Sequence, residues 1–341
     1  MATARIGIIG ASGFTGAELL RLCAQHPGIE VAFATGDSQA GNAAADLYPG
    51  LALAYPDLIF QPWDPSLLDG VDGVFMGLPH GASQRIVPEL LGNVGAIVDL
   101  GADFRLTDAA EYERWYHEPH TAPELLDRFV YGLPELHRDA LKGAGAIAAP
   151  GCYPTAATLA LRPLMDAGLI ESTGIIVDAM SGVSGAGRPP KPTTTFCAVD
   201  SDVQAYGLLD HRHTSEMDMN LGATVLFTPH LVPMSRGILA TCYARPAVDG
   251  LSTATLMEVL IDRYEDEPFV VASERSPSTK ATLGTNAAHV TARYDERTGT
   301  VLALAAIDNL GKGASGQAMQ CMNLALGLPE TQGLAVVGTT P

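Results

Sequence analysis

One cysteine stands in a context that could support nucleophilic chemistry: Cys152, in the stretch APGCYPT at residues 149–155. The small-residue run 144–149 predicts a short buried strand, and the apolar run 155–167 predicts a helix. Cys152 would then lie at the helix N-terminus, where backbone N–H groups and the helix dipole stabilise a thiolate. The other interpretation is a structural cysteine, as most free cysteines are, so the residues around it must decide.

Two histidines are the candidates for proton transfer. His211 and His213 lie in the stretch HRHTSEM, where Thr214 is predicted to cap a helix that runs toward Leu221. A nucleophilic thiol needs a titratable neighbour, and histidine titrates in the right range, with Glu216 able to orient the ring. A metal site is not expected, because no Cys or His set with ligand spacing accompanies the pair.

A glycine-rich turn near the start of the chain predicts dinucleotide binding. The apolar strand 5–9 runs into GASGFTG and then into a helical pattern at 17–22. Glycines there let the backbone approach a pyrophosphate, and the helix N-terminus provides donors. The spacing is G-x-x-G-x-x-G, so an ordinary strand-to-helix turn is the alternative. The residues predicted to bind the dinucleotide are Gly10, Ser12, Gly13, Phe14, Thr15 and Gly16.

Further ligand contacts are expected where later strands end. After the strand 30–34, Asp37 could bind a ribose diol, whereas Ser38 and Thr35 could bind a 2′-phosphate, so NAD and NADP both stay open. The strands 74–76 and 96–100 are followed by the cleft candidates Pro79, His80, Ser83 and Arg105.

A second glycine-rich stretch, SGVSGAGR at residues 181–188, could expose successive backbone N–H groups to an anion or to the nicotinamide end of a cofactor. A flexible loop is the alternative. Its candidate residues are Ser181, Gly182, Gly185 and Arg188.

These stretches must be positioned by two kinds of architecture. Alternating strands and helices over residues 1–150 predict an α/β domain with a Rossmann-like, doubly wound parallel sheet. Long strands with few helices between them predict a second, α+β domain at 151–313 with a mixed or antiparallel sheet. The segment 314–341 contains a last helix, expected to pack back on the first domain. Residues 107–138 are expected to be an irregular but structured excursion.

Composition narrows the class of protein. The net charge of −18 argues against nucleic acid as a partner, since that partner needs a basic face. The five cysteines form no CxxC pair, which is typical of reduced thiols in the cytoplasm. No apolar run is long enough to span a bilayer and no leader pattern opens the chain, so we expect a cytoplasmic protein without a membrane partner.

Together, these motifs resemble the N-acetyl-γ-glutamyl-phosphate reductase family. The resemblance also rests on GLPHG at 77–81, ADFR at 102–105 and DNLGKG at 308–313, and it extends from residue 7 to about residue 325. Three positions depart from the family pattern without removing a chemical group, because tyrosine, proline and a branched apolar residue are usual at Phe14, Ser215 and Gly311 respectively.

The resemblance implies reduction of a small acyl-phosphate substrate to an aldehyde with NADPH, in arginine biosynthesis, by a homodimer or homotetramer. Cys152 would attack the acyl carbonyl, phosphate would leave, and the resulting thioester would accept hydride. The family pattern matches both histidines, and we favour His213 as the acid/base, with His211 as the alternative.

The same resemblance suggests which residues hold the charged groups. Arg105 is the first candidate for phosphate, because a guanidinium fork matches phosphate oxygens. Arg188 and Lys312 are secondary candidates for phosphate, carboxylate or cofactor, and Asn309 could bind the nicotinamide carboxamide.

Other functions stay open at this point. Aspartate-semialdehyde dehydrogenase and N-acetyl-aminoadipyl-phosphate reductase would use the same architecture and thioester chemistry, and only the substrate pocket would differ. A cysteine acyltransferase or hydrolase is a different class, against which the two glycine-rich stretches count. A non-catalytic nucleotide sensor would not need Cys152 beside a histidine pair.

Overall fold

The computed structural model describes residues 3–339, which divide into two compact units. The first unit comprises the chain up to Pro150 together with Ala314–Leu334. The second comprises Gly151–Gly313 and the segment from Ala335 onward.

The expected domain division treated 314–341 as one segment that packs on the first domain. In the structure this segment is divided: Ala314–Leu334 belongs to the first unit, and the residues from Ala335 onward belong to the second. Beyond Leu334, hydrogen bonds attach the tail to the second unit: Asn286 N donates to Ala335 O (2.9 Å) and Thr339 N donates to Leu283 O (3.2 Å). Backbone hydrogen bonds to residues 283–286 therefore position this tail, since the last helix ends at Ala325.

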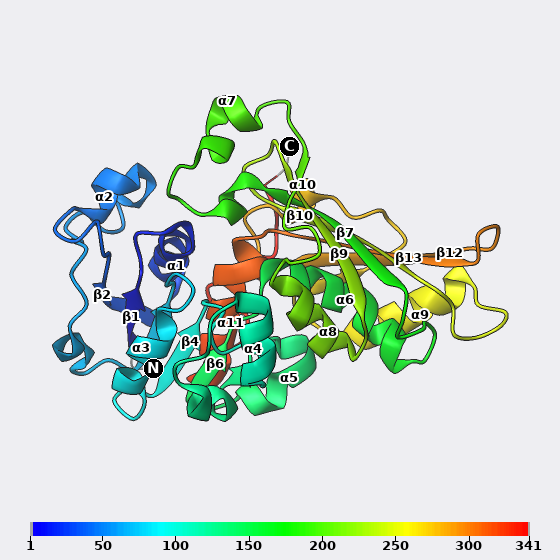
Figure 1. Ribbon diagram of the computed structural model, residues 1–341. Coiled ribbons are helices and arrows are strands. Elements are labelled where there is room, and N and C mark those ends of the chain that lie inside the picture. The colour runs from blue at the N-terminus through cyan, green and yellow to red at the C-terminus, as the bar shows by residue number, and fades with distance from the viewer. Residues whose placement is uncertain (1–2, 340–341) are drawn as a thin grey trace. The chain divides into compact units, whose positions relative to one another are not determined.

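A six-stranded parallel sheet forms the centre of the first unit, in the order β2-β1-β3-β4-β6-β5. Its strands are β1 (Ala4–Ile9), β2 (Ile29–Ala34), β3 (Gly73–Met76), β4 (Ala96–Asp99), β5 (Val130–Tyr131) and β6 (Ala146–Ala148). Because β2 and β3 lie on opposite sides of β1, the sheet is wound in both directions (Figure 1). The predicted Rossmann-like sheet is confirmed.

Helices cover both faces of this sheet. Neighbouring residues of a strand point to opposite faces, so Phe75 packs with α1 and α11 in one core cluster while Met76 packs with α3 in another. The helices of this unit are α1 (Phe14–Gln25), α2 (Ala44–Leu47), α3 (Ser83–Leu90), α4 (Ala109–Tyr116), α5 (Pro134–Leu141) and α11 (Gly316–Ala325).

The segment 107–138 is more regular than expected. It contains α4, whose N-cap Asp108 accepts a hydrogen bond from Ala110 N (2.8 Å), and α5, which begins at Pro134. Each helix has only eight residues, so the apolar period repeats too few times to be recognised in the sequence.

A seven-stranded mixed sheet forms the second unit, in the order β11-β12-β13-β10-β7-β9-β8. The pairs β7–β9 and β11–β12 are parallel and the others antiparallel, which confirms the predicted mixed sheet. Its strands are β7 (Ile175–Gly182), β8 (Gln204–Ala205), β9 (Val225–Val232), β10 (Ile238–Ala244), β11 (Val270–Ala272), β12 (Ala288–Asp295) and β13 (Thr300–Ile307).

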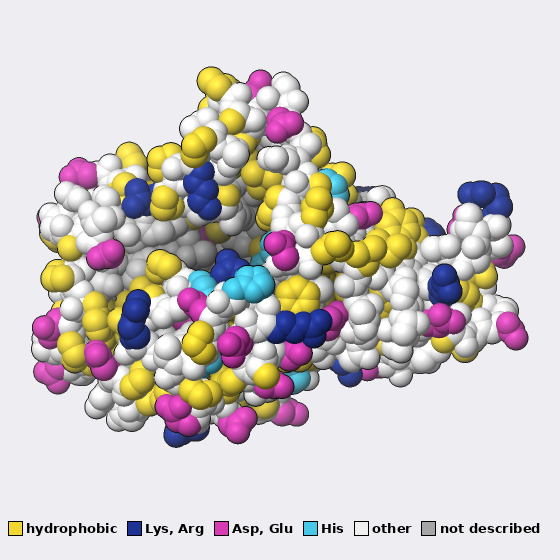
Figure 2. Space-filling view, viewed as in Figure 1, with side chains coloured by type: hydrophobic (Ala, Val, Ile, Leu, Met, Phe, Trp, Pro, Cys, Tyr) yellow, Lys and Arg dark blue, Asp and Glu magenta, His cyan; other side chains and the backbone are white. Residues whose placement is uncertain are grey.

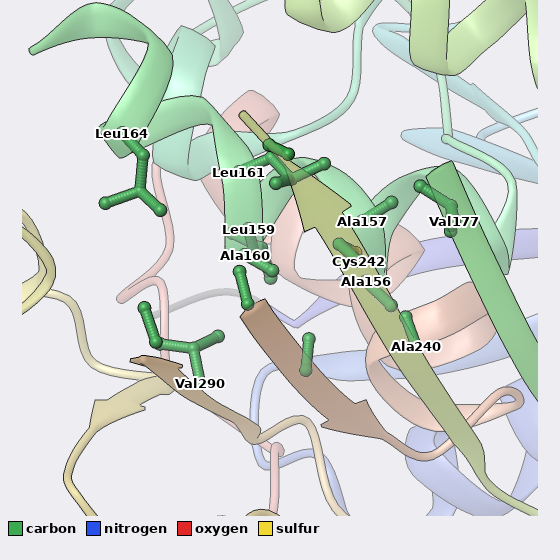
Figure 3. Packing of buried hydrophobic residues seen from close by; sticks show 14 of the residues in the cluster. Ala156, Ala157, Leu159, Ala160, Leu161, Leu164, Val177, Ala240, Cys242 and Val290 are labelled. Carbon is green, nitrogen blue, oxygen red and sulfur yellow. The ribbon is translucent and has the colours of Figure 1, made fainter. Parts of the chain in front are cut away.

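One face of the mixed sheet is covered by helix α6 (Cys152–Asp166), which carries the cysteine at its first residue. Small side chains such as Ala156 and Ala160 let this helix approach the strands, where Val177 and Ala240 face it (Figure 3). The other helices of the unit are α7 (Phe196–Val199), α8 (His213–Leu221), α9 (Thr253–Tyr264) and α10 (Thr279–Thr282).

The opposite face of the mixed sheet carries exposed apolar side chains. Residues alternate along β7, with Val177 buried while Ile176 and Met180 are 37% and 46% exposed. Leu226 on β9 and Tyr243 on β10 are 47% and 37% exposed. Figure 2 shows hydrophobic side chains gathered where Figure 1 draws β7 and β9. We call these four residues the open sheet face.

Across residues 3–339 there is no helix with the length and apolar character needed to cross a membrane.

Candidate active site

Cys152 occupies the first position of α6, directly after the N-cap residue Gly151. The thiol side chain is partly exposed. The backbone of Gly313 packs against it so closely that a Cβ at residue 313 would lie 2.8 Å from the Cys152 Cβ. The first position of a helix favours a thiolate, because the unpaired N–H groups and the positive end of the helix dipole lie there and stabilise negative charge.

Glu216 connects the start of α6 with α8. Its carboxylate is fully buried, and Oε2 accepts a hydrogen bond from Gly151 N (2.9 Å). The other oxygen, Oε1, lies 4.0 Å from His213 Nε2. A Cβ at Gly151 would lie 2.6 Å from the same His213 nitrogen, so the imidazole packs directly on the residue before Cys152. Cys152, His213 and Glu216 form what we call the cysteine group.

His211 lies beside this group in an aromatic environment. Its ring contacts Tyr153, Tyr206 and Phe227 edge-on, with centroid distances of 5.8, 5.5 and 5.2 Å. Burial, followed by the charge of Arg212, lowers the pKa of His211 to about 4. The ring is therefore neutral around pH 7, which suits a supporting histidine better than one that exchanges protons.

The start of α8 differs from the sequence expectation, and the His211 ring is the reason. Thr214 does not cap α8: the helix begins one residue earlier, and Thr214 lies buried in its first turn. Instead, His213 N donates to His211 Nδ1 (3.2 Å), so an imidazole nitrogen takes the role expected of a threonine hydroxyl. Ser215, where proline is usual in the family pattern, donates its hydroxyl to Arg212 O (2.8 Å).

The second glycine-rich stretch is tied to Asn309. β7 ends at Gly182, and a 3₁₀ turn covers Val183–Ala186. Asn309 Nδ2 donates to Ser184 Oγ (2.9 Å), and Asn309 Oδ1 accepts from Gly237 N (2.7 Å). Asn309 thus connects the stretch, through Ser184, to the residue before β10, a contact that its expected cofactor role did not include.

Three further candidates belong to the second unit. Ser181 is buried and donates its hydroxyl to Gly182 O (3.1 Å). Arg188 Nε is buried without a hydrogen-bond partner within residues 3–339. Lys312 is fully buried, with Nζ 5.8 Å from the centroid of the Phe269 ring.

Gly311, another departure from the family pattern, precedes this lysine in a π-helical turn, Gly311–Ser315. A Cβ at Gly311 would overlap the Thr285 carbonyl. Glycine is therefore required by the close backbone approach in this chain.

The predicted dinucleotide turn lies in the first unit, between β1 and α1. Gly10 has φ +82°, and its N–H donates to Thr35 Oγ1 (3.1 Å). Phe14 begins α1 and Gly13 is its N-cap, which has no side chain to cap the first N–H groups of the helix. A Cβ at Gly10 would lie 2.5 Å from Gly77 O, which explains the glycine.

The residues that would distinguish NADP from NAD follow β2. Thr35 is buried and its hydroxyl is engaged by Gly10, whereas Asp37 and Ser38 are exposed. Of the three expected contacts, Asp37 and Ser38 are therefore the ones open to a ligand.

Arg105 is held at the carboxyl end of the parallel sheet. Its side chain is largely buried; Nε donates to Ala149 O (2.8 Å) and Nη2 donates to Leu100 O (2.9 Å). The positive charge is thus fixed beside the strand end that leads to Pro150.

The predicted residues fall into two sets. The cysteine group, His211, the 181–188 stretch, Asn309 and Lys312 belong to the second unit. The dinucleotide turn, Ser38, Pro79 and Arg105 belong to the first.

Sequence reasoning missed two residues of the site, Gly313 and Tyr206. Gly313 packs closely on Cys152, and the Tyr206 hydroxyl lies 3.0 Å from the Tyr153 hydroxyl; neither contact leaves a local pattern in the sequence. Within residues 3–339, no group of three His, Cys, Asp or Glu side chains is arranged to hold a metal.

Comparisons with known proteins assign both units to one family. Residues 5–144 match the model of the semialdehyde dehydrogenase NAD binding domain, and residues 152–309 match that of the dimerisation domain. A relative from Desulforudis audaxviator, named N-acetyl-gamma-glutamyl-phosphate reductase, is 50% identical over 99% of each chain. The chain belongs to the N-acetyl-gamma-glutamyl-phosphate reductase family. A member of this reductase family from Symbiobacterium thermophilum is 47% identical over 98% of this chain and 99% of its own.

Membership of the reductase family confirms the resemblance and makes the chain an oxidoreductase with an NAD(P)-binding domain. The fold agrees with solved structures of aspartate semialdehyde dehydrogenases. The enzyme from Vibrio cholerae has a TM-score of 0.70 at 17% identity, and that from Candida albicans, solved with NADP, has 0.71 at 15% identity. Each covers 96% of this chain and 99% of its own. At these low sequence identities, the similarity supports the fold and not the substrate.

Proposed function

We propose that the protein reduces N-acetyl-γ-glutamyl phosphate to N-acetylglutamate semialdehyde and phosphate with NADPH, as a step of arginine biosynthesis in the cytoplasm. The observation that carries this proposal is the 50% identity, over 99% of both chains, to a relative named for that reaction. The cysteine group supplies the chemistry that the reaction needs.

In the proposed reaction, the Cys152 thiolate attacks the acyl carbonyl carbon, the bond from that carbon to the phosphate oxygen breaks, and phosphate leaves. The product is a thioester on the cysteine sulfur. NADPH, when bound, supplies the hydride that reduces it. The hemithioacetal then collapses, the carbon–sulfur bond breaks, and the semialdehyde leaves.

His213 is the proposed acid/base. It packs on Gly151, and Glu216 stands 4.0 Å from its Nε2, so the carboxylate can stabilise the protonated ring. His211 supports this histidine by accepting its backbone N–H. The low pKa of His211, about 4, favours His213 for the proton transfers.

The cofactor is proposed to bind along the turn from Gly10 to Gly16, including Ser12, Gly13, Phe14 and Thr15. NADP is preferred if Ser38 binds the 2′-phosphate, and Asp37 is the residue that would favour NAD. Further cofactor contacts are assigned to Pro79, Ser181, Gly182, Gly185, Asn309 and Lys312.

Phosphate is assigned to Arg105 and, secondarily, to Arg188. Arg105 is fixed by two backbone carbonyls, so its position does not have to be ordered when substrate binds. Arg188 has a buried Nε without a protein partner within residues 3–339, and a carboxylate or phosphate oxygen would satisfy it.

We also propose that the protein is a homodimer through the open sheet face. Four apolar side chains on adjacent strands are exposed there, and a two-fold axis would place the same face against itself. The model that matches the second unit is described as a dimerisation domain. A homotetramer would need a second contact surface.

The deciding experiment is a steady-state assay in the oxidative direction, with phosphate, NADP or NAD, and either N-acetylglutamate semialdehyde or aspartate semialdehyde. We expect turnover with the first aldehyde and NADP. Preferential use of aspartate semialdehyde would replace the proposed substrate. The variant Cys152→Ser should lose nearly all turnover yet still bind NADPH, and substantial remaining turnover would exclude the thioester route.

A further inference from the structure

Asp308 is the centre of a polar cluster in the second unit that the proposed reaction does not use. Its side chain is completely buried. Because β13 ends at Ile307, Asp308 opens the turn that leads to Gly313, the residue packed on Cys152. A buried carboxylate needs several donors, and the donors to Asp308 come from separate parts of the chain.

Arg236 is the charged partner of Asp308. Its Nε donates to Asp308 Oδ1 (3.1 Å) and its Nη2 lies 2.9 Å from Asp308 Oδ2, so the guanidinium fork meets both carboxylate oxygens. The arginine side chain is 21% exposed, whereas the aspartate is fully buried. Loss of the arginine would therefore leave a buried charge without this positive partner.

Asp308 also organises the turn that follows it. Its Oδ1 accepts from Leu310 N (2.9 Å) and Gly311 N (3.2 Å), and its Oδ2 accepts from Gly284 N (2.6 Å). The backbone oxygen of Asp308 accepts from Gly313 N (2.9 Å). The side chain and the backbone of one residue thus both hold this turn.

The arginine itself belongs to the segment 234–237, which pairs with the start of the second glycine-rich stretch. Three backbone hydrogen bonds of 2.9–3.1 Å run from the N–H groups of 182–184 to carbonyl oxygens of this segment. A Cβ at Gly182 would lie 2.7 Å from Arg236 N, so the two backbones are in direct contact. Asn309 forms hydrogen bonds to both segments. The ion pair therefore joins the glycine-rich stretch to the turn that packs on the cysteine.

That turn reaches the proposed nucleophile through one glycine. A Cβ at Gly313 would lie 2.8 Å from the Cys152 Cβ and 3.2 Å from Asp308 O. Gly313 is thus held by the aspartate on one side and touches the cysteine on the other. A shift of the turn would change the space at the first residue of α6, where the sulfur must be aimed at the acyl carbonyl.

We propose that Arg236 and Asp308 are positioning residues for the reaction. Their ion pair holds the turn 308–313 against Cys152 and keeps the stretch 182–184 beside that turn. Neither side chain has to touch the substrate for this role. The reaction that the pair serves rests on the proposed function, whereas the positioning rests on the contacts themselves.

Three substitutions at the ion pair test this role. Arg236→Gln removes the charge, and Arg236→Lys keeps the charge but loses the planar fork. Asp308→Asn keeps the shape but replaces an accepting oxygen by an amide donor. Arg297→Gln is the matched control, because Arg297 forms an exposed ion pair with Asp295 (3.4 Å) in the same unit and the charge changes equally.

Steady-state oxidation of N-acetylglutamate semialdehyde, with phosphate and NADP, would separate kcat from KM. We expect kcat to fall about 10-fold or more in Arg236→Gln and Asp308→Asn, because a displaced nucleophile slows the chemistry. KM for the aldehyde should stay within about 3-fold of wild type, since binding contacts are kept. Arg236→Lys should lie between Arg236→Gln and wild type, and Arg297→Gln should match wild type.

Hydrogen exchange measured by mass spectrometry tests the same contacts without a substrate. Thr155 N donates to Gly151 O (3.0 Å) and closes the first turn of α6. In Arg236→Gln, exchange should rise about 10-fold in peptides that contain 308–313 and in the peptide that contains Thr155, because the turn no longer supports the helix start. Exchange in α9 should stay at the wild-type rate.

Wild-type kcat in Arg236→Gln would overturn the proposal, and so would wild-type kcat in Arg236→Lys if the other two variants failed to fold. A higher KM with unchanged kcat would overturn it as well, since that pattern reports a residue that binds the substrate. Faster exchange throughout the unit, α9 included, would report general damage and reject the positioning role. A wild-type protein that does not oxidise this aldehyde would instead contradict the proposed function, while hydrogen exchange would still test the ion pair.

Discussion

At the scale of single residues, Glu216 explains how a histidine 61 positions along the chain comes to lie beside the cysteine. Its two oxygens face different partners, the N–H of Gly151 and the His213 ring. The carboxylate is buried, so losing the hydrogen bond from Gly151 N would cost part of the stabilisation that a buried charge needs. The residue types in this group could be predicted, but the hydrogen bond from Gly151 N to the Glu216 carboxylate could not, because a long-range contact to the backbone leaves no pattern in the sequence.

The two histidines should differ in their effect on the rate. His213→Asn should lower kcat by about 10²–10⁴-fold, the usual contribution of a positioned acid/base. His211→Asn should lower it by less than about 10-fold, because an asparagine oxygen can still accept the His213 N–H. Steady-state kinetics of both variants at one saturating phosphate concentration would test this, and a larger loss in His211→Asn would reverse the assignment.

The buried His211 should also make stability depend on pH. Its pKa of about 4 in the folded protein lies below the ordinary histidine value of 6.5, so the unfolded chain binds more protons between these values. Its contribution to stability is fully present above pH 6.5 and is lost as the pH falls toward 4. Denaturant unfolding between pH 7 and pH 5 should therefore show a smaller loss of stability in His211→Asn than in wild type. Parallel curves would contradict this.

At the scale of elements, long strands were predictable and short helices were not. The long strands predicted for the second domain are observed, as in β10 (Ile238–Ala244), because alternating burial leaves a clear pattern. Helices α4 and α5 were missed, and so was the two-residue strand β8, since each is too short for a period to show. The π-helical turn before α11 was also missed, because it follows from the contact between Gly311 and Thr285.

The start of α6 depends on the absence of a side chain at Gly313. In Gly313→Ala the new Cβ would meet the Cys152 Cβ at 2.8 Å and Asp308 O at 3.2 Å. The helix start must then move, so we expect kcat to fall at least about 10-fold and stability to fall by about 1–3 kcal/mol, as overpacking usually costs.

Kinetics and thermal unfolding would measure both effects. Gly50→Ala is the control, because nothing lies within 4 Å of a Cβ at that glycine. Wild-type kinetics in Gly313→Ala would show that the thiol does not need its observed position.

At the scale of the whole molecule, two sheets of different character were predictable from the spacing of strands along the chain. The alternation of strands and helices before residue 150, and its loss afterwards, separated them correctly. A last helix was expected to pack back on the first domain, and Ala314–Leu334 belongs to the first unit, but the place of the tail from Ala335 in the second unit was not expected. The segment from Ala335 is attached by backbone hydrogen bonds, which nearly every residue type can make, so its position leaves no pattern in the sequence.

The proposed homodimer predicts which surface substitution changes the mass in solution. Leu226→Asp places a charge on the open sheet face and should weaken association by about 100-fold or more, as a desolvated charge at an interface centre does. Light scattering across a dilution series would report the mass. Ile261→Asp is the control, since Ile261 on α9 is also 47% exposed. A dimer that survives Leu226→Asp but not Ile261→Asp would move the interface to α9.

The distribution of the five thiols has a practical consequence. Cys23, Cys242 and Cys321 are buried, and burial raises the pKa of each of the first two to about 12. Only Cys152 and the exposed Cys197 can meet a reagent in the folded protein, within residues 3–339. Replacing Cys197 with serine would therefore leave a single reactive thiol, at the proposed nucleophile. Protection of that thiol from an alkylating mass tag would then count occupied active sites directly, without any assay of turnover.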